Sequence, residues 1–206
     1  MKKKIVVATR NRDKLKEIKQ IFETYCKDKY ELLCIEDFEN IPEVEEDGKT
    51  LKENAIKKAK VIGDIVGMPT VSEDTGLFVD YLNGAPGVFS ARYADTGKKH
   101  NCTYEDNYKK LLRELKGVPW EKRTAEFVCV ACLYLPKKNK YYTRTGKVKG
   151  YITFEPKGEG GFGYDPVFYY PPKQKTFAEL TKEEKNSVSH RFLAFKNIIS
   201  VIKEVV

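Results

Sequence analysis

The sequence lacks any long hydrophobic run. Its 206 residues contain no stretch of eighteen consecutive apolar residues, so we expect no membrane-spanning helix. The basic start at residues 1–4 is followed only by Ile5-Val6-Val7-Ala8, which is too short for a signal peptide and is typical of a first strand. The five cysteines are an odd number without a secretory signal, so we expect reduced thiols in the cytoplasm.

Internal repeats, low-complexity segments and linkers are also absent, which favours a single domain over residues 1–206. The 38 Lys and Arg residues exceed the 30 Asp and Glu residues and give a net charge of +8. Such a charge favours polyanionic partners, either nucleotides or nucleic acid. Because the lysines are spread along the chain rather than gathered in one block, a stable complex with nucleic acid is not expected.

The hydrophobic pattern alternates between strands and helices, which indicates an α/β protein. Strands are expected at residues 4–9, 30–35, 125–135 and 141–154, the last two as an antiparallel pair. Helices are expected after Asn11, from the capping box Thr50-x-x-Glu53 to Val66, over residues 104–115, and as one final helix from the cap Thr181-x-x-Glu184.

The stretch Val71-Ser72-Glu73-Asp74-Thr75-Gly76-Leu77 combines two carboxylates and a hydroxyl after an apolar start. We expect a strand that ends in an acidic loop, followed by a second strand. Acidic residues at a strand end in an α/β protein commonly hold a metal ion or act as a base. The alternative is a solvated turn between two strands.

A second polar segment, Thr9-Arg10-Asn11-Arg12-Asp13-Lys14, joins the first strand to a helix. A helix start offers unpaired backbone amides and the positive end of the helix dipole, both of which suit phosphate. The glycines of a Walker sequence are absent, and an ordinary capped helix is the alternative.

Two further segments carry candidate ligands. The acidic loop at residues 39–48 either stays solvated or supplies a carboxylate that shares a divalent ion with Asp74. The glycine-rich segment at residues 158–166 allows the backbone to close on a flat ligand, and Phe162 and Tyr164 offer stacking faces. The alternative for this second segment is a glycine-rich hairpin with aromatic plugs.

Several motifs occur together in a characteristic order. They are Thr9-x-Asn11-x-x-Lys14, Asn54-Ala55-x-x-Lys58-Ala59, Glu73-Asp74-Thr75-Gly76-Leu77, Gly84-x-Pro86-Gly87-x-x-Ser90-Ala91-Arg92, Gly161-Phe162-Gly163-Tyr164-Asp165-Pro166 and Lys185-Asn186-x-x-Ser189-His190-Arg191. In this order they resemble the inosine triphosphate pyrophosphatase family, the RdgB-like purine nucleoside triphosphate pyrophosphatases. The similarity covers nearly the whole chain. Thr75 replaces a frequent Ser and keeps the hydroxyl, and Arg10 stands where a small residue is frequent.

The resemblance implies an elongated, two-lobed α/β fold with a twisted mixed sheet, flanking helices and a cleft between the lobes. It also implies a homodimer that hydrolyses ITP, dITP and XTP to the monophosphate and pyrophosphate, with Mg²⁺ as the cofactor and Mn²⁺ as a substitute. This reaction would keep deaminated purines out of nucleic acids.

The resemblance also assigns roles to single residues. It makes Asp74 the catalytic base and a metal ligand, and we expect Glu43 as the second metal ligand, with Glu46 and Glu73 as weaker candidates. The implied substrate-binding residues are Thr9, Arg10, Asn11, Arg12, Asp13, Lys14, Lys58, Thr75, Phe162, Gly163, Tyr164, Asp165, Lys185, His190 and Arg191. Arginine only donates hydrogen bonds, so Arg191 would pair with the 6-oxo group of hypoxanthine or xanthine and not with the amino group of adenine.

Two other interpretations remain. A Maf-like pyrophosphatase would act on pyrimidine or modified nucleotides, but the Ser189-His190-Arg191 and Gly161–Pro166 segments argue against it. A non-enzymatic nucleic-acid binder would explain the charge of +8 and would bind RNA or DNA in a salt-dependent manner without nucleotide turnover.

Overall fold

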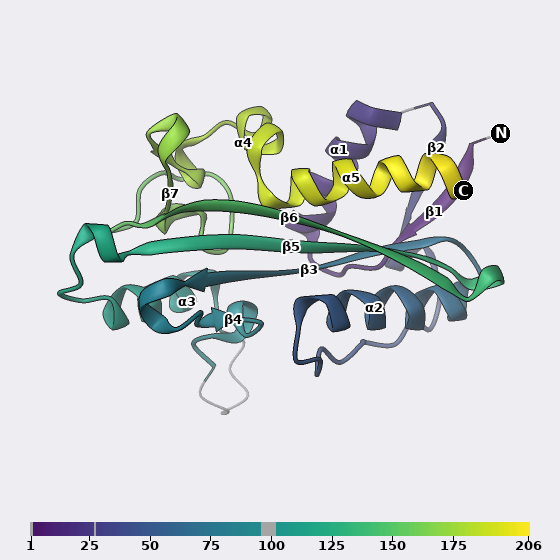
Figure 1. The fold of residues 1–206 in the computed structure, drawn as a ribbon. Coiled ribbons are helices and arrows are strands. Elements are labelled where there is room, and N and C mark those ends of the chain that lie inside the picture. Colours follow the sequence, from purple (N-terminus) through teal and green to yellow (C-terminus); the bar gives the residue numbers. More distant parts are fainter. Residues whose placement is uncertain (1, 27, 96–101) are drawn as a thin grey trace. The chain divides into compact units, whose positions relative to one another are not determined.

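The computed structural model describes residues 2–26, 28–95 and 102–206 and shows an open, twisted mixed sheet flanked by helices (Figure 1). The helices are α1 (Arg12–Cys26), α2 (Leu51–Val66), α3 (Tyr104–Glu114), α4 (Lys182–Val188) and α5 (His190–Val205). The strands are β1 (Lys3–Val7), β2 (Tyr30–Cys34), β3 (Thr70–Val79), β4 (Pro86–Gly87), β5 (Thr124–Leu135), β6 (Lys140–Ile152), β7 (Phe168–Tyr170) and β8 (Lys175–Thr176). No helix in these residues is long and apolar enough to span a membrane.

The strands lie in the order β2-β1-β3-β5-β6-β7-β8, and β4 pairs with β3. Strand β1 is parallel to both β2 and β3, whereas β7 is antiparallel to β6 and to β8. The neighbours β5 and β6 are joined only by residues 136–139. So short a connection permits antiparallel strands alone, which confirms the predicted pair.

The chain forms two compact units. Unit 1 comprises residues 1–74, 129–146 and 189–206, and unit 2 comprises residues 75–128 and 147–188. Strands β3, β5 and β6 each run from one unit into the other.

In unit 1, alternate residues of β1 point to opposite faces of the sheet, as the pleat of a strand requires. Ile5 and Val7 join a core cluster with residues of α1 and α5, whereas Val6 and Ala8 pack with Ile62 of α2. Helices α1 and α5 accordingly cover one face, and α2 covers the other (Figure 1). The burial of Ile5, Val6 and Val7 on both faces of the sheet explains why this part of β1 is continuously apolar, whereas Lys3 and Lys4 at its start are exposed.

In unit 2, three aromatic rings form a compact group. Phe127 of β5 lies 4.6 Å from Phe168 of β7, between ring centroids, and stacks at 6.0 Å on Phe177. The Phe168 and Phe177 rings are 4.9 Å apart. All these separations fall in the range that aromatic pairs prefer, so the group anchors β7 to β5.

Two elements differ from the predictions. Strand β3 is continuous from Thr70 to Val79, so the expected acidic loop does not form and both acids lie within the strand. The single final helix is interrupted at Ser189, whose side chain accepts a hydrogen bond from the Phe192 amide and caps α5. A serine side chain at this position favours a new helix start over continuation of the previous helix.

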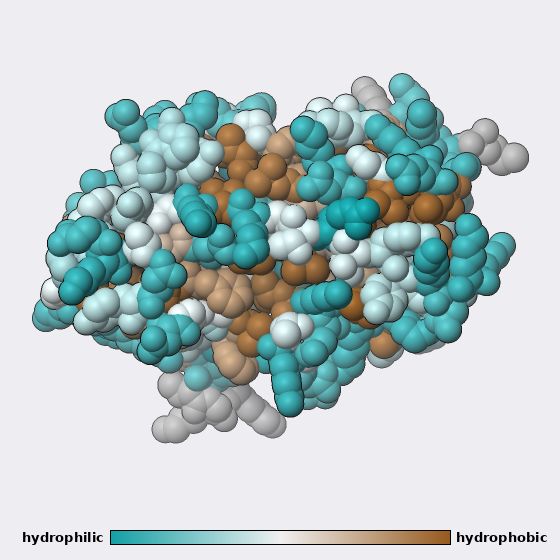
Figure 2. Space-filling view, viewed as in Figure 1, coloured by the Kyte–Doolittle hydropathy of each residue, from teal (hydrophilic) through white to brown (hydrophobic). Residues whose placement is uncertain are grey.

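On the face shown in Figure 2, most of the surface is hydrophilic, and hydrophobic side chains gather over the carboxyl-terminal half of α5. In the same region of unit 1, the partly buried Val205 and Val206 pack against the core cluster.

Candidate functional site

Strand β3 extends beyond the carboxyl end of β1. The parallel register pairs Val7, where β1 ends, with Val71 of β3. The next residues of β3, including Glu73 and Asp74, therefore continue past the end of β1. In open α/β sheets this edge, at the carboxyl ends of the parallel strands, is where ligands bind.

The segment after β1 forms the predicted cap of α1. The Asn11 side-chain oxygen accepts hydrogen bonds from the backbone amides of Asp13 and Lys14, both at 3.0 Å. The Thr9 hydroxyl accepts from the Asn11 amide at 3.2 Å. The exposed Arg10 is turned to the carbonyl of Ile41, at 2.6 Å. This segment is thus an ordered strand-to-helix turn, as the sequence predicts.

Glu73 points to the sheet face that α1 and α5 cover. It is 2% exposed, and its Oε1 lies 2.5 Å from the Lys14 Nζ. Its Oε2 lies 3.5 Å from the Arg191 Nη2 and accepts a hydrogen bond from the Cys129 thiol at 3.3 Å. Arg191 itself is 1% exposed and also pairs with Glu17 at 2.5 Å. The partly buried Lys14 and the buried Glu73 and Arg191 thus form one network of alternating charge.

Asp74, the next residue, points to the opposite face, toward α2. Its Oδ2 accepts a hydrogen bond from the Asn54 side-chain amide at 3.0 Å, and its Oδ1 lies 3.8 Å from the Lys58 Nζ. The Lys58 ammonium also pairs with Glu46. Because Asn54 and Lys58 are four residues apart on α2, they present adjacent side chains to Asp74.

The two adjacent acids have pKa values shifted in opposite directions. Burial alone would raise the pKa of Glu73, but Lys14 and Arg191, with Lys58, hold it well below its usual range. Burial raises the pKa of Asp74; Lys58 and Lys14 oppose this shift, while Glu46 and Glu73 add to it. Glu73 is therefore a fixed anion, whereas Asp74 is the more basic carboxylate.

The partner of Asp74 among the acidic-loop residues is Glu46. Glu43, which the sequence favours as the second metal ligand, is exposed, whereas Glu46 is half-buried and shares the Lys58 ammonium with Asp74. Within the described residues no three Asp, Glu, His or Cys side chains group as metal ligands. Two carboxylates that share one cation still suit Mg²⁺, since proteins commonly hold this ion with one or two carboxylates and leave the other positions to phosphate and water.

Unit 2 brings together three further predicted residues: Phe162, Asp165 and Lys185. The Lys185 Nζ lies 2.5 Å from the Asp165 Oδ2 and 4.5 Å from the Phe162 ring centroid. The Phe162 amide donates to the same Asp165 oxygen at 2.7 Å. A Cβ at Gly161 would lie 2.2 Å from that oxygen, so only glycine fits there.

The positions of the other predicted residues give less direct support for a role in the site. Tyr164 is buried and donates its hydroxyl to the Ser90 carbonyl at 2.7 Å, which indicates a structural contact. Thr75 is half-buried, and the adjacent Gly76 is required because a Cβ there would lie 2.5 Å from the Gly87 carbonyl oxygen. His190 is the buried first residue of α5. Arg12 has an exposed side chain. Gly163 has a backbone φ of 65°.

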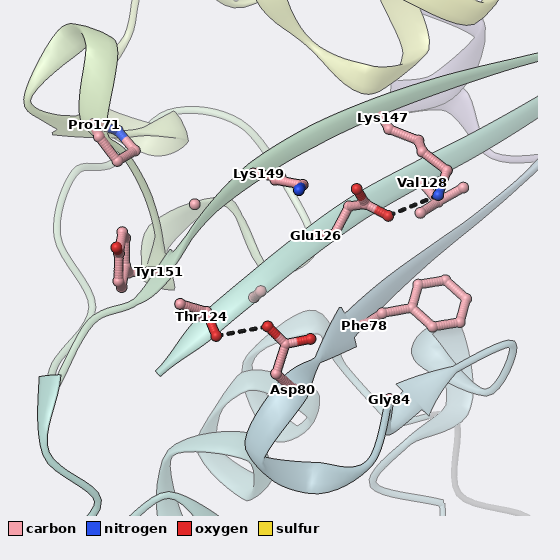
Figure 3. A pocket seen from close by; sticks show the side chains of 12 residues that line it. Phe78, Asp80, Gly84, Thr124, Glu126, Val128, Lys147, Lys149, Tyr151 and Pro171 are labelled. Carbon is pink, nitrogen blue, oxygen red and sulfur yellow. Dashed lines mark hydrogen bonds and ion pairs between the residues drawn. The ribbon is translucent and has the colours of Figure 1, made fainter. Parts of the chain in front are cut away.

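A pocket of about 750 Å³ lies elsewhere in unit 2 (Figure 3). Its walls include Phe78, Lys149 and Tyr151, with a hydrogen bond from Thr124 to Asp80 and an ion pair between Lys147 and Glu126. None of the predicted site residues lines this pocket. We assign it no part in the site.

The sequence alone did not single out several contacting residues. Asn54 lay in a recognised motif but had no assigned role, and Glu17 and Cys129 were not considered as partners of the site. The spacing of Glu17 from Lys14, one helical turn along α1, is the only sequence signal for its place. Cys129 reaches Glu73 from a different strand, so no local pattern could reveal that contact.

The open mixed sheet flanked by helices defines an α/β protein, and its charged side chains lie at the edge where such sheets usually bind ligands. More closely, the chain belongs to the Ham1 family, whose profile matches residues 5–201. The dITP/XTP pyrophosphatase of Geobacter sulfurreducens is 50% identical over 188 residues, which cover 91% of this chain and 90% of that protein. The dITP/XTP pyrophosphatase of Dictyoglomus thermophilum is 45% identical over 198 residues, or 96% and 93% of the two chains.

Solved structures agree with this assignment. A HAM1 protein from Coxiella burnetii superposes with a TM-score of 0.86 at 37% identity, over 98% of this chain and all (100%) of that one. The Ham1 protein of Staphylococcus aureus gives a TM-score of 0.83 at 37% identity, over 98% and 99% of the two chains.

Proposed function

We propose that this protein is a nucleoside triphosphate pyrophosphatase that hydrolyses ITP, dITP and XTP to the monophosphate and pyrophosphate. It would thereby remove deaminated purine nucleotides from the precursor pool. The proposal is supported by relatives at 45–50% identity that bear the name dITP/XTP pyrophosphatase. The structural observation that carries it is the pair Glu73 and Asp74, whose pKa values lie on opposite sides of their usual ranges.

Asp74 is the general base of this proposal. Its raised pKa makes it a better proton acceptor than an exposed aspartate, and Asn54 orients its carboxylate through the hydrogen bond to Oδ2. In the reaction the Asp74 carboxylate would take a proton from the attacking water, whose oxygen bonds to the α-phosphorus. The bond from this phosphorus to the bridging oxygen then breaks, and pyrophosphate leaves. Lys58, held beside Asp74, supplies positive charge for the phosphates.

Lys14 and the amino-terminal end of α1 form the second phosphate-binding element of the proposal. Burial would lower the pKa of Lys14, but Glu73 outweighs this and raises it, so the ammonium stays charged. The start of α1 adds the positive end of the helix dipole, while the Asp13 and Lys14 amides donate to the Asn11 side chain and hold the turn in place.

Asp74 and Glu46 would hold Mg²⁺, with Mn²⁺ as a substitute, and this assignment replaces Glu43. When bound, the ion lowers the pKa of a water molecule and neutralises phosphate charge. We further propose a homodimer in the cytoplasm that forms no stable complex with nucleic acid. Size-exclusion chromatography with light scattering tests the dimer.

A phosphate-release assay coupled to inorganic pyrophosphatase tests the function. ITP, dITP and XTP should be hydrolysed much faster than ATP, dTTP and UTP, and omission of the coupling enzyme should abolish the phosphate signal. Faster turnover of dTTP or UTP would instead favour the Maf-like alternative. Salt-dependent RNA binding without turnover of any nucleotide would favour the nucleic-acid binder.

A further inference from the structure

The aromatic residue Phe162 has an aromatic neighbour to which the sequence motifs assign no role. The ring of Tyr104 lies 5.8 Å from the Phe162 ring, between centroids, with an angle of 44° between the planes. This separation lies within the range that aromatic pairs prefer. Both residues belong to unit 2, although they are 58 positions apart in the chain (162 minus 104).

The backbone around Tyr104 is held firmly. Thr103 and Asp106 form a capping box in which the Thr103 hydroxyl accepts from the Asp106 amide at 3.1 Å and the Thr103 amide donates to Asp106 at 2.8 Å. One turn further along α3, the buried Asn107 donates to the Ala91 carbonyl at 3.1 Å. Tyr104 is therefore the first residue of a fixed helix rather than part of a loose loop.

Phe162 is fixed in a similar way. Its amide donates to Asp165, and the Lys185 ammonium lies over its ring. The Tyr104 side chain nevertheless remains 41% exposed, although it contacts another ring. Because the two ring planes meet at 44°, the exposed Tyr104 ring forms an angled apolar wall beside the Phe162 ring.

We propose that Tyr104 and Phe162 form an angled two-ring surface for the base, in which Phe162 contacts the face of the base and Tyr104 its outer edge, and that Tyr104 selects for purines. This inference rests on the proposed function and on the stacking face that the sequence predicts for Phe162. A purine is a fused two-ring system and extends past the edge of a single phenyl ring, so it reaches Tyr104. The single ring of a pyrimidine covers Phe162 alone and gains nothing from Tyr104.

The test compares Tyr104→Leu with Tyr104→Phe and with Tyr81→Leu, a matched control at another exposed tyrosine of unit 2 (51% exposed). Isothermal titration calorimetry measures the binding of IMP, UMP and pyrophosphate to each folded variant with Mg²⁺ present. We expect Tyr104→Leu to weaken IMP by about 5- to 20-fold, the size of one lost aromatic contact with a base. Binding of UMP and pyrophosphate should not change, and Tyr104→Phe should bind IMP as the wild type does.

Equal weakening of all three ligands would overturn the inference, because a damaged fold affects every ligand alike. Unchanged IMP binding by Tyr104→Leu, or no measurable IMP binding by the wild type, would also overturn it. In steady-state kinetics with ITP, Tyr104→Leu should raise KM and leave kcat nearly unchanged. The binding assay needs no turnover, so it tests this inference separately from the proposed function. If the wild-type protein bound IMP through Tyr104 but did not hydrolyse ITP, the proposed function would be wrong and this inference would stand.

Discussion

Glu73 and Asp74 are neighbours in β3, yet their carboxylates lie on opposite faces of the sheet and contact different helices. Glu73 meets Lys14 of α1 and Arg191 of α5, whereas Asp74 meets Asn54 and Lys58 of α2. The two acids therefore have different surroundings. Cations stabilise the ionised form of Glu73, whereas burial raises the pKa of Asp74. Each of these differences leads to a measurable expectation.

Replacement of Asp74 by Asn should keep the fold and lower kcat for ITP on the order of 100-fold or more, because the proton acceptor is lost while the shape is preserved. Steady-state kinetics and circular dichroism of the purified variant check this. Near-normal turnover in a folded Asp74→Asn protein would remove Asp74 from the chemistry.

The pH profile of kcat/KM, which reports the free enzyme, should have an acid limb whose midpoint lies above 3.8, the usual pKa of aspartate. The sign follows from the role of Asp74, since a base works only when deprotonated, and burial raises the pKa of this carboxyl. Activity should therefore rise with pH through this limb. An acid limb centred at or below 3.8 would contradict the raised pKa.

Glu46→Gln should raise the Mg²⁺ concentration that activity requires much more than Glu43→Gln does, because Glu46 shares the Lys58 ammonium with Asp74. The measurement is the Mg²⁺ concentration for half-maximal activity in each variant. The wild type should lose activity on exhaustive chelation and recover it with Mg²⁺ or Mn²⁺. The reverse order of the two variants would return the metal site to Glu43.

Glu73→Gln should lower the free energy of unfolding by about 3–5 kcal/mol, the usual cost of removing one partner of a buried ion pair. Lys14 and Arg191 would then face a neutral amide in the interior. Urea unfolding measures the loss, and Glu105→Gln, which breaks an exposed pair with Lys109, is the control that should change little. Since the pKa of Glu73 is lowered, its stabilisation is complete above its usual value of 4.5 and is lost as pH falls through the lowered pKa.

Arg191→Ala should reduce the preference for ITP over ATP by about 2–4 kcal/mol in kcat/KM, if its guanidinium donates to the 6-oxo group. Arg191→Lys should recover part of the loss, because lysine keeps the charge without the planar fork. If kcat/KM fell equally for ITP and ATP, Arg191 would have no role in base selection and would act only through its ion pairs with Glu17 and Glu73.

The sequence predicted those parts of the fold that local patterns encode. The apolar run before Thr9, the Asn11 cap and the Thr50-x-x-Glu53 capping box all appear in the structure as expected. These features depend on neighbouring residues, so short-range chemistry determines them.

The missed features depend on contacts between distant segments. The sequence predicted a loop at Glu73 and Asp74, because consecutive acidic residues disfavour a strand. Their partners on the two faces of the sheet nevertheless stabilise both residues within β3. Glu43 as the second metal ligand stays a prediction, and the contact of Glu46 with Lys58 of α2 could not be foreseen from the sequence. The break at Ser189 was missed because helical periodicity continues across it.

The division of the chain has a consequence for its synthesis. Unit 1 is assembled from residues 1–74, 129–146 and 189–206, and its core cluster includes Phe195 and Ile198 of α5. The ribosome makes all of unit 2 before it reaches α5. The core of unit 1 therefore remains incomplete through most of translation, and contacts of such high sequence separation slow folding. A nascent chain stalled before residue 189 would expose the apolar surfaces of α1 and β1 to chaperones and proteases.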